Sequence, residues 1–356
     1  MTDNAPHIVV IGATNMDRVR IHPDLDRVED GKFRAGHSYS AVGGGGANVA
    51  IALKEIANTF NDPLEVTFFT KIGREHRDYP VRHEVLEKLD SVGVDVRDMV
   101  PNQDHRIDDN TVISFKGGRF VSLQEEFAKG KAATHPLEQD RPSADPCDPG
   151  MEQQIIEAVR DADLVVVTHH FPDMSEIAAT AAQKAGVPVL MDYPVTNYEA
   201  AWKYQRTLES CEYILAPAEA RLPDMIGGSY KNGNSLFSKL TGRFPNKFIA
   251  VSDGTEPVMT HHDGRKEQIP VTQYPVVDQL GTGDVRTAAF VYFMVKEEAP
   301  ERALIQATGI ASFSVQYPGR QWIEHLPDYM KAHRLPSGQS ANDPENEGEQ
   351  PFTSIA

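Results

Sequence analysis

Residues 276–290, VVDQLGTGDVRTAAF, combine a short apolar run, a glycine-rich turn and an acid that opens an apolar segment. This order predicts a strand, a turn and a helix, with the helix beginning at Gly283 or Asp284. Gly281 and Gly283 flank Thr282, and glycine leaves no side chain between the peptide N–H groups and whatever lies above them. The unpaired N–H groups and the dipole of the helix start would favour an anion there.

Asp284 would stand beside such an anion site. A carboxylate in that place could take a proton from an attacking hydroxyl group while the N–H groups hold a phosphoryl oxygen. The same sequence also suits an ordinary helix start, with Asp284 as the N-cap. Taken alone, the stretch favours the ordinary helix start, so the rest of the chain must decide between the two interpretations.

Composition narrows the class of protein. With 356 residues, 40% of them hydrophobic, the chain can bury the core of one large domain or two modest ones. Its formal charge of -17 opposes binding to nucleic acid or to anionic membranes. Residues 1–6 lack a signal-peptide pattern, no apolar run is long enough to span a membrane, and Cys147 and Cys211 form no disulfide framework. We therefore expect a soluble cytoplasmic protein.

Two polar side chains follow the first predicted strand. Residues 7–12 form a continuous apolar run closed by glycine, which is typical of a buried parallel strand. Asn15 and Asp17 come next, and ligands of open α/β sheets bind beyond the carboxyl ends of the strands. These side chains are placed to hydrogen-bond a polyhydroxylated ligand, although Asp17 could equally be a turn residue.

Four glycines, Gly43 to Gly46, run directly into an apolar segment that predicts a helix to about Asn58. Such a run is either a flexible hinge or a stretch of backbone that a ligand approaches closely. The abrupt helix favours the second interpretation, with Asn48 facing the ligand from the first helical turn.

The rest of the chain alternates between predicted helices and strands. Helices are expected over 151–160, 175–185, 198–208 and 235–240, and strands over 164–168, 187–191, 213–216 and 248–251. Repeated units of this kind predict a parallel sheet that is covered by helices on both faces.

Several segments fall outside this alternation. Residues 18–40 have no helical period and residues 111–124 resemble a hairpin, so we expect them to form a small β lid. The exposed edges of such a lid could pair between subunits, which makes a homodimer through the lid an expectation. Residues 127–150 are rich in proline and predict a variable surface loop, and residues 334–356 predict a disordered tail.

Three separated segments carry a family resemblance: GATNMD at 12–17, GGGGAN at 43–48 and DQLGTGD at 278–284. Their order and spacing resemble the ribokinase-like (PfkB) family of carbohydrate kinases. The resemblance covers about residues 7–330 and leaves residues 127–150 unmatched. It implies a ribokinase-like three-layer α/β/α sandwich with a central, mostly parallel sheet and a small β lid.

The resemblance implies one kinase domain over residues 1–333, which transfers phosphate from ATP to a hydroxyl group of a small sugar or sugar derivative. Asp284 would be the general base, and Gly281, Thr282 and Gly283 would form the anion hole. The sugar would be held by Asn15, Asp17, Gly43, Gly44 and Asn48. Positioning and charge stabilisation dominate phosphoryl transfer, and Mg²⁺ would neutralise the nucleotide phosphates.

The resemblance also implies a nucleotide site, formed by Ser252, Asp253 and Gly254 at the end of a strand. Asp278 would help to order a loop for a monovalent cation such as K⁺. The family usually has an Asn-x-x-Glu element tied to Mg²⁺ where this chain has Ala218-Glu219-Ala220-Arg221. Glu219 is therefore a candidate metal ligand, and Arg221 is a candidate phosphate contact.

Two alternatives stay open on these residues. A nucleoside kinase shares the fold, and the segment 127–150 could make room for a base. The other alternative is a sugar-binding regulatory protein with impaired catalysis. The segment 218–221 favours it, because it departs from the family, whereas the intact segment 281–284 argues against it.

Overall fold

The structure is a computed structural model. It describes residues 5–22, 36–74, 81–103, 105, 107–115, 120–124, 147–195, 198–222, 233–296 and 298–333. The tail predicted over 334–356 and nearly all of the loop predicted over 127–150 lie outside the described residues.

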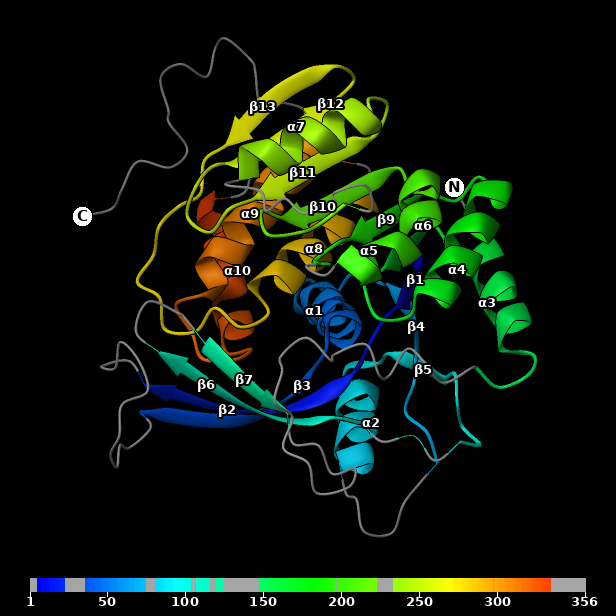
Figure 1. Ribbon diagram of the computed structural model, residues 1–356. Helices are drawn as coiled ribbons and strands as arrows, with labels where there is room; N and C mark the ends of the chain where they lie inside the picture. The colour runs from blue at the N-terminus through cyan, green and yellow to red at the C-terminus, as the bar shows by residue number, and fades with distance from the viewer. Residues whose placement is uncertain are drawn as a thin grey trace.

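The described part of the chain is built on a nine-stranded sheet in the order β13-β12-β11-β10-β9-β8-β1-β4-β5 (Figure 1). Strands from β11 to β5 are parallel, and β12 and β13 extend the sheet by antiparallel pairing. The bounds are β1 (His7–Ile11), β4 (Glu65–Thr70), β5 (Asp95–Asp98), β8 (Leu164–Val167), β9 (Val189–Asp192), β10 (Tyr213–Pro217), β11 (Phe248–Ser252), β12 (Val258–His262) and β13 (Arg265–Ile269). The predicted, mostly parallel sheet is confirmed.

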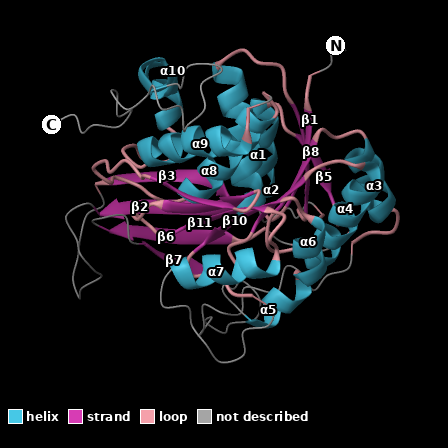
Figure 2. Cartoon of the chain, turned by 90° about the horizontal axis from the view of Figure 1, so that it is seen from above, coloured by secondary structure: helices cyan, strands magenta, loops and turns pink. Residues whose placement is uncertain are grey.

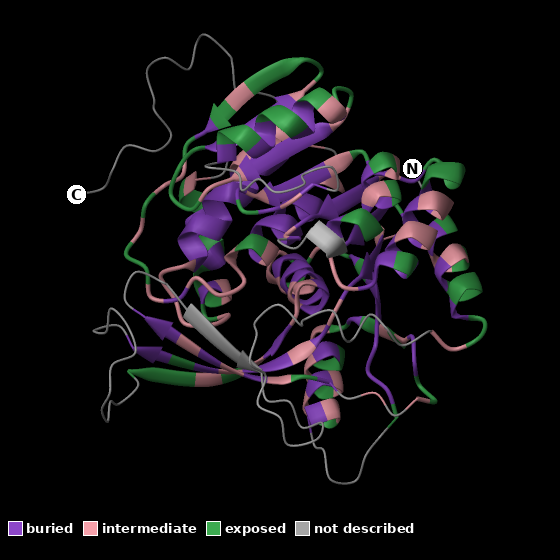
Figure 3. Ribbon diagram, viewed as in Figure 1, coloured by how far each residue is buried: buried purple, intermediate pink, exposed green. Residues whose placement is uncertain are grey.

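Helices cover both faces of this sheet (Figures 2 and 3). Successive side chains of a strand point to opposite sides, so each strand contributes apolar side chains to both faces. Ile8 and Val10 of β1 pack in one hydrophobic cluster, whereas Val9 and Ile11 pack in the other. The first cluster includes α1 (Gly45–Thr59), α2 (Val81–Val92), α8 (Thr282–Met294), α9 (Pro300–Ser314) and α10 (Trp322–His333). The second includes α3 (Met151–Arg160), α4 (Pro172–Ala185), α5 (Tyr198–Lys203), α6 (Gln205–Ser210) and α7 (Gly233–Arg243). The layers are therefore α/β/α.

A second, four-stranded sheet stands apart from the first (Figure 1). Its order is β3-β2-β6-β7, with bounds β2 (Asn15–His22), β3 (His37–Gly43), β6 (Asp109–Phe115) and β7 (Phe120–Gln124). Val19, Ile21 and Val112 form its small core. The predicted small sheet is thus present, but β2 begins at Asn15, directly after the turn that leaves β1.

Two local predictions were wrong. Val276 and Val277 form no strand: Val276 is 37% exposed, and the N–H groups of Val277 and Asp278 both donate to the Val315 carbonyl oxygen. Apolar residues need a neighbouring strand to pair with, and here the segment crosses the end of α9 instead. The helix predicted over 198–208 is also broken in two, as α5 and α6.

Among the described residues, no helix combines the length and the apolar composition that a membrane crossing needs.

Candidate active site

Asp284 lies in the first turn of α8, where the chain enters the helix through Gly281 at φ +76°. Its Oδ2 atom accepts a hydrogen bond of 2.8 Å from Nδ2 of Asn48, which lies in the first turn of α1. The side chain reaches a cavity but otherwise lies deep in the protein, and its pKa is raised to about 7. Desolvation is the largest cause and the negative charge of Asp192 acts in the same direction, whereas Asn48 and Arg320 lower the pKa.

A second acid and a buried arginine lie near Asp284. Asp192 ends β9, and its Oδ2 atom accepts a hydrogen bond of 3.2 Å from the Thr287 hydroxyl. Burial raises the pKa of Asp192, and Arg286 partly opposes that rise. Burial likewise lowers the pKa of Arg286, against the effect of the two acids. The site therefore holds two carboxylates and one guanidinium away from bulk water.

The structure brings most of the predicted sugar-binding residues to one cavity of about 340 Å³. The residues of that prediction that line it are Asn15, Asp17, Gly44 and Asn48, together with Gly281 and Asp284 of the predicted catalytic group. Gly43 lies beside the cavity, where a Cβ atom would come within 1.9 Å of the Asp17 carboxylate. Only glycine fits there without displacing Asp17.

Asp17 is held in place by two amides. Its Oδ1 atom accepts hydrogen bonds from Nδ2 of Asn15 at 2.7 Å and from Nδ2 of Asn110 at 3.2 Å. The side chain is buried, which raises its pKa, and the two hydrogen bonds oppose that effect. The carboxylate is thus fixed at the wall of the cavity.

Four residues of this cavity carry a buried polar atom that has no hydrogen-bond partner within the described part of the chain. The atoms are Thr14 Oγ1, Asn15 Oδ1, Asn110 Oδ1 and His169 Nδ1. Buried polar groups in folded proteins are nearly always hydrogen-bonded. These four atoms are closed to solvent, so the case for a ligand with several hydroxyl groups rests on the polar residues Asn15, Asp17 and Asn48 that line the cavity.

The turn before α8 is shaped by hydrogen bonds and by open space. The Asp278 carboxylate accepts hydrogen bonds from the Tyr39 hydroxyl and from the N–H groups of Leu280 and Gly319. The Thr282 hydroxyl donates to the Gln279 carbonyl oxygen at 2.8 Å. A Cβ atom built on Gly283 would meet nothing within 4 Å. The turn is held firmly, and the space above Gly283 is open.

The predicted nucleotide residues form a separate group, at the carboxyl ends of β10 and β11. Ser252 ends β11, and the next residue, Asp253, accepts a hydrogen bond of 3.1 Å from the Gly233 N–H group at the start of α7. Arg221 Nη1 donates to the Glu219 carbonyl oxygen at 2.8 Å, while the Glu219 side chain is exposed. Gly254 follows with φ +58°. In the strand order, β9 with Asp192 lies between this group and the sugar cavity.

Comparison with known proteins gives the family. The family model for pfkB family carbohydrate kinases matches residues 5–325. The chain belongs to this family. A ribokinase of Arabidopsis thaliana is 27% identical over 346 residues, which cover 93% of this chain and 81% of that protein.

Solved structures agree with the fold of this pfkB kinase. A ribokinase from Giardia lamblia superposes with a TM-score of 0.67 at 17% identity, covering 91% of this chain and 99% of that chain. Arabidopsis thaliana ribokinase, complexed with ribose and ATP, superposes with a TM-score of 0.61 at 23% identity, covering 89% of this chain and 94% of that chain. These similarities confirm the predicted ribokinase-like fold, and the family makes the protein a carbohydrate kinase.

Several cavity residues of the pfkB kinase were missed by the sequence analysis. His169 and His170 come one residue after the end of β8, and Lys71 directly follows β4, so their places after strands were a usable signal. Burial and the neighbouring His170 lower the pKa of His169 well below its ordinary value, which keeps its ring neutral. Asn110, by contrast, lies within β6, and no pattern near it pointed to a ligand.

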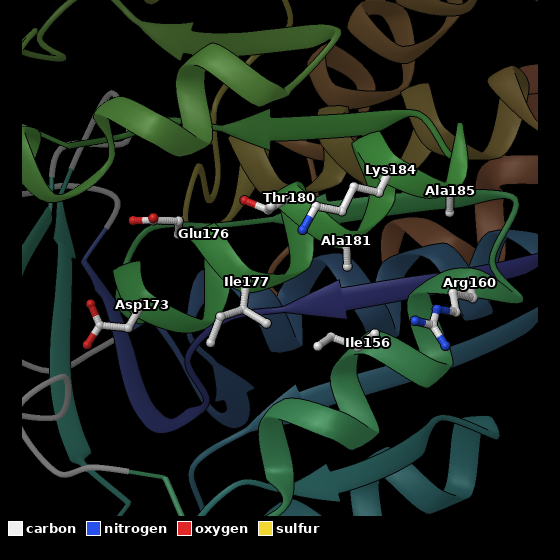
Figure 4. Close-up of a pocket in the computed structure, with 9 residues that line it drawn as sticks. All are labelled: Ile156, Arg160, Asp173, Glu176, Ile177, Thr180, Ala181, Lys184 and Ala185. Atoms are coloured by element: carbon white, nitrogen blue, oxygen red, sulfur yellow. The ribbon is translucent and has the colours of Figure 1, made fainter.

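A larger hollow, of about 670 Å³, lies on the outer surface between α3 and α4 (Figure 4). Its lining includes Arg160, Glu176, Ile177 and Lys184, and it contains none of the predicted site residues. Volume alone does not make it the active site, because Asp284 and most of the predicted sugar-binding residues line the smaller cavity.

Proposed function

We propose that this pfkB kinase transfers the γ-phosphoryl group of ATP to a hydroxyl group of a small sugar or sugar derivative, with Asp284 as the general base. One observation carries the proposal: Asp284 lines the same cavity as Asn15, Asp17 and Asn48, whose polar side chains can hydrogen-bond the hydroxyl groups of a sugar. A sugar bound there would place a hydroxyl group next to the base.

The proposal gives further roles to the residues around Asp284. Asp17, Asn48 and the backbone at Gly44 hold the sugar, and Asn48 also holds Asp284 by its hydrogen bond of 2.8 Å. The Gly281–Gly283 turn serves as the anion hole, since it begins α8 and the space above Gly283 is open. Because the pKa of Asp284 is about 7, the base is partly ionised at neutral pH and can accept a proton late in the transfer.

In this proposal, the nucleotide and the metal bind at the carboxyl ends of β10 and β11. Ser252, Asp253 and Gly254 contact ATP in this proposal, and Arg221 approaches its phosphates. The described residues contain no cluster of three or more metal-binding side chains. Mg²⁺ commonly keeps its waters and takes only one or two carboxylates besides the substrate phosphates. Glu219 would be such a carboxylate, and Asp278 would order the loop for K⁺.

A nucleoside kinase of the same fold is the second candidate. The sugar cavity shares Lys71 and Phe171 with an adjoining hollow of about 690 Å³, which offers room for a base beside the sugar.

The test is an ATP-turnover screen with Mg²⁺, with and without K⁺, over a panel of pentoses, hexoses, sugar acids and nucleosides. Asp284→Ala is measured beside the native protein. We expect ADP formation with a sugar, and a loss of at least about a hundredfold in the variant. Turnover with nucleosides alone would favour the second candidate. No turnover, with a sugar that still raises the melting temperature, would indicate a sugar-binding protein that has lost catalysis.

A further inference from the structure

Arg320 lies in the loop between α9 and α10, and its side chain reaches the residues around the base. Its Nη2 atom donates to Oδ1 of Asn48 at 2.9 Å and, more weakly, to the Val42 carbonyl oxygen of β3 at 3.4 Å. Its Nη1 atom lies 3.6 Å from Oε2 of Glu55 in α1. Only 20% of the side chain is exposed. Arg320 is therefore linked to Asp284 by two hydrogen bonds, with Asn48 between them.

The chemistry of the Asn48 amide gives a direction to this hydrogen-bond chain, which runs from Arg320 through Asn48 to Asp284. Arginine has donors only, and an ionised carboxylate has acceptors only, whereas the Asn48 amide has one end of each kind. Arg320 faces Oδ1, so Nδ2 must face Asp284, where the distance is 2.8 Å. A rotated amide would set donor against donor at Arg320 and acceptor against acceptor at Asp284. Arg320 and Asp284 thus impose the same orientation on the Asn48 amide.

We propose that Arg320 is a positioning residue for the transfer: it fixes the Asn48 amide so that its N–H group points at Asp284 and keeps that carboxylate ionised and aligned. This inference rests on the proposed role of Asp284 as the base, and it assigns the regulation of that base to a loop residue that was not among the predicted site residues. Arg320 touches neither sugar nor ATP in this scheme.

Several charged groups face Asp284, and their effects have opposite signs. Asp192 from β9 and Asp17 from β2 raise its pKa, while Arg320 lowers it. Arg286, two residues after Asp284 in α8, also interacts with the charge of Asp284. Removing Arg320 would take away a positive charge and would release the amide that donates to the carboxylate. Asp284 would then keep its proton to higher pH, and the base would be protonated at neutral pH.

The test uses Arg320→Met, which keeps the length of the side chain, and Arg320→Lys, which keeps its charge and a donor. Arg302→Met is the matched control, because Arg302 is also a poorly exposed arginine beside a carboxylate, at 3.8 Å from Glu298. The full chain is assayed for kcat against pH with MgATP and the panel sugar that gives the highest turnover. Far-UV circular dichroism checks that each variant is folded.

We expect Arg320→Met to lose about tenfold or more of kcat at pH 7, with its acid limb moved to higher pH and with part of the loss recovered at pH 9. Arg320→Lys should keep a profile close to native, and Arg302→Met should keep the native profile. In an Asn48→Ala background, Arg320→Met should have a smaller effect, because the contact through Asn48 is already absent and only the positive charge is lost. A loss in Arg320→Met that is equal at every pH would overturn the inference and indicate a structural role.

A second measurement does not depend on any substrate. Urea unfolding from pH 5 to pH 9 reports the titration of Asp284. Because its pKa in the folded state lies above the ordinary value, the free energy of unfolding falls as pH rises toward that folded-state pKa. In Arg320→Met this fall should continue to higher pH than in the native protein. An unchanged pH dependence would contradict the inference even if no sugar were turned over. Native activity in Asp284→Ala would instead refute the role of the base, leaving the hydrogen-bond chain itself intact.

Discussion

Replacing Asp284 with asparagine should remove activity and at the same time stabilise the folded protein at alkaline pH. The carboxylate is the only group changed, and asparagine can still accept the hydrogen bond that Asn48 donates at 2.8 Å. In the native protein the pKa of Asp284 rises from the model-compound value of 3.8 to about 7, mainly because of burial. Asparagine carries no charge, so the variant does not have the free-energy cost of burying an ionised carboxylate.

The sign and size of the effect follow from proton linkage. Between its ordinary pKa and its folded pKa, Asp284 holds its proton only in the folded state, so stability falls as pH rises. At about 1.4 kcal/mol per pKa unit, the fall between pH 5 and pH 8 amounts to about 2–3 kcal/mol. Asp284→Asn lacks this titration, and the nearby Asp192 is relieved of a negative neighbour, which acts in the same direction.

The measurement is urea unfolding of both proteins at pH 5 and pH 8. We expect the stability advantage of Asp284→Asn to grow by about 2–3 kcal/mol between the two pH values. The exposed Asp90→Asn controls for a change from acid to amide elsewhere on the chain. An advantage of the same size at both pH values would refute the reasoning that Asp284 is desolvated.

Three further predictions concern the cavity. Turnover should fall about fivefold from pH 7 to pH 6 as Asp284, with a pKa of about 7, takes up its proton; a kcat–pH profile that is flat over this range would contradict its role. Gly43→Ala should raise KM for the sugar by about tenfold or more, because the new Cβ atom would lie 1.9 Å from the Asp17 carboxylate, and an unchanged KM would show that the backbone yields. His169→Phe should raise KM for the sugar and leave KM for ATP unchanged, as steady-state kinetics with each substrate varied can show.

The sequence was sufficient to predict the order of the βα units and the place of Asn15 and Asp17 after the first strand, whereas the grouping of Asn48 and Asp284 with them was implied by the family resemblance. Parallel strands end at one edge of a sheet, so polar residues that follow such strands gather there without any knowledge of the pairing. The same rule applied to His169, which follows β8, and could have added it. These predictions succeed because they depend on local pattern and on general topology.

Other features depend on contacts that no local pattern encodes. Val276 and Val277 are apolar enough for a strand, but the sheet edge beyond β11 is already paired with β12. Asn110 holds Asp17 from 93 residues away, and Arg320 holds Asn48 from 272 residues away. The residues near Arg320 form an ordinary loop before a helix, so only the folded chain reveals what its guanidinium contacts.

The span of the hydrogen-bond chain also sets a schedule for the newly made protein. Asn48 belongs to the first helix of the chain, whereas its partners lie 236 and 272 residues later. At a synthesis rate of about 5–20 residues per second, roughly 15–50 s separate the emergence of the amide from that of Arg320. For most of that interval a nascent chain on the ribosome contains Asn48 but neither Asp284 nor Arg320. The two contacts of the Asn48 amide can therefore form only when nearly the whole chain has been made.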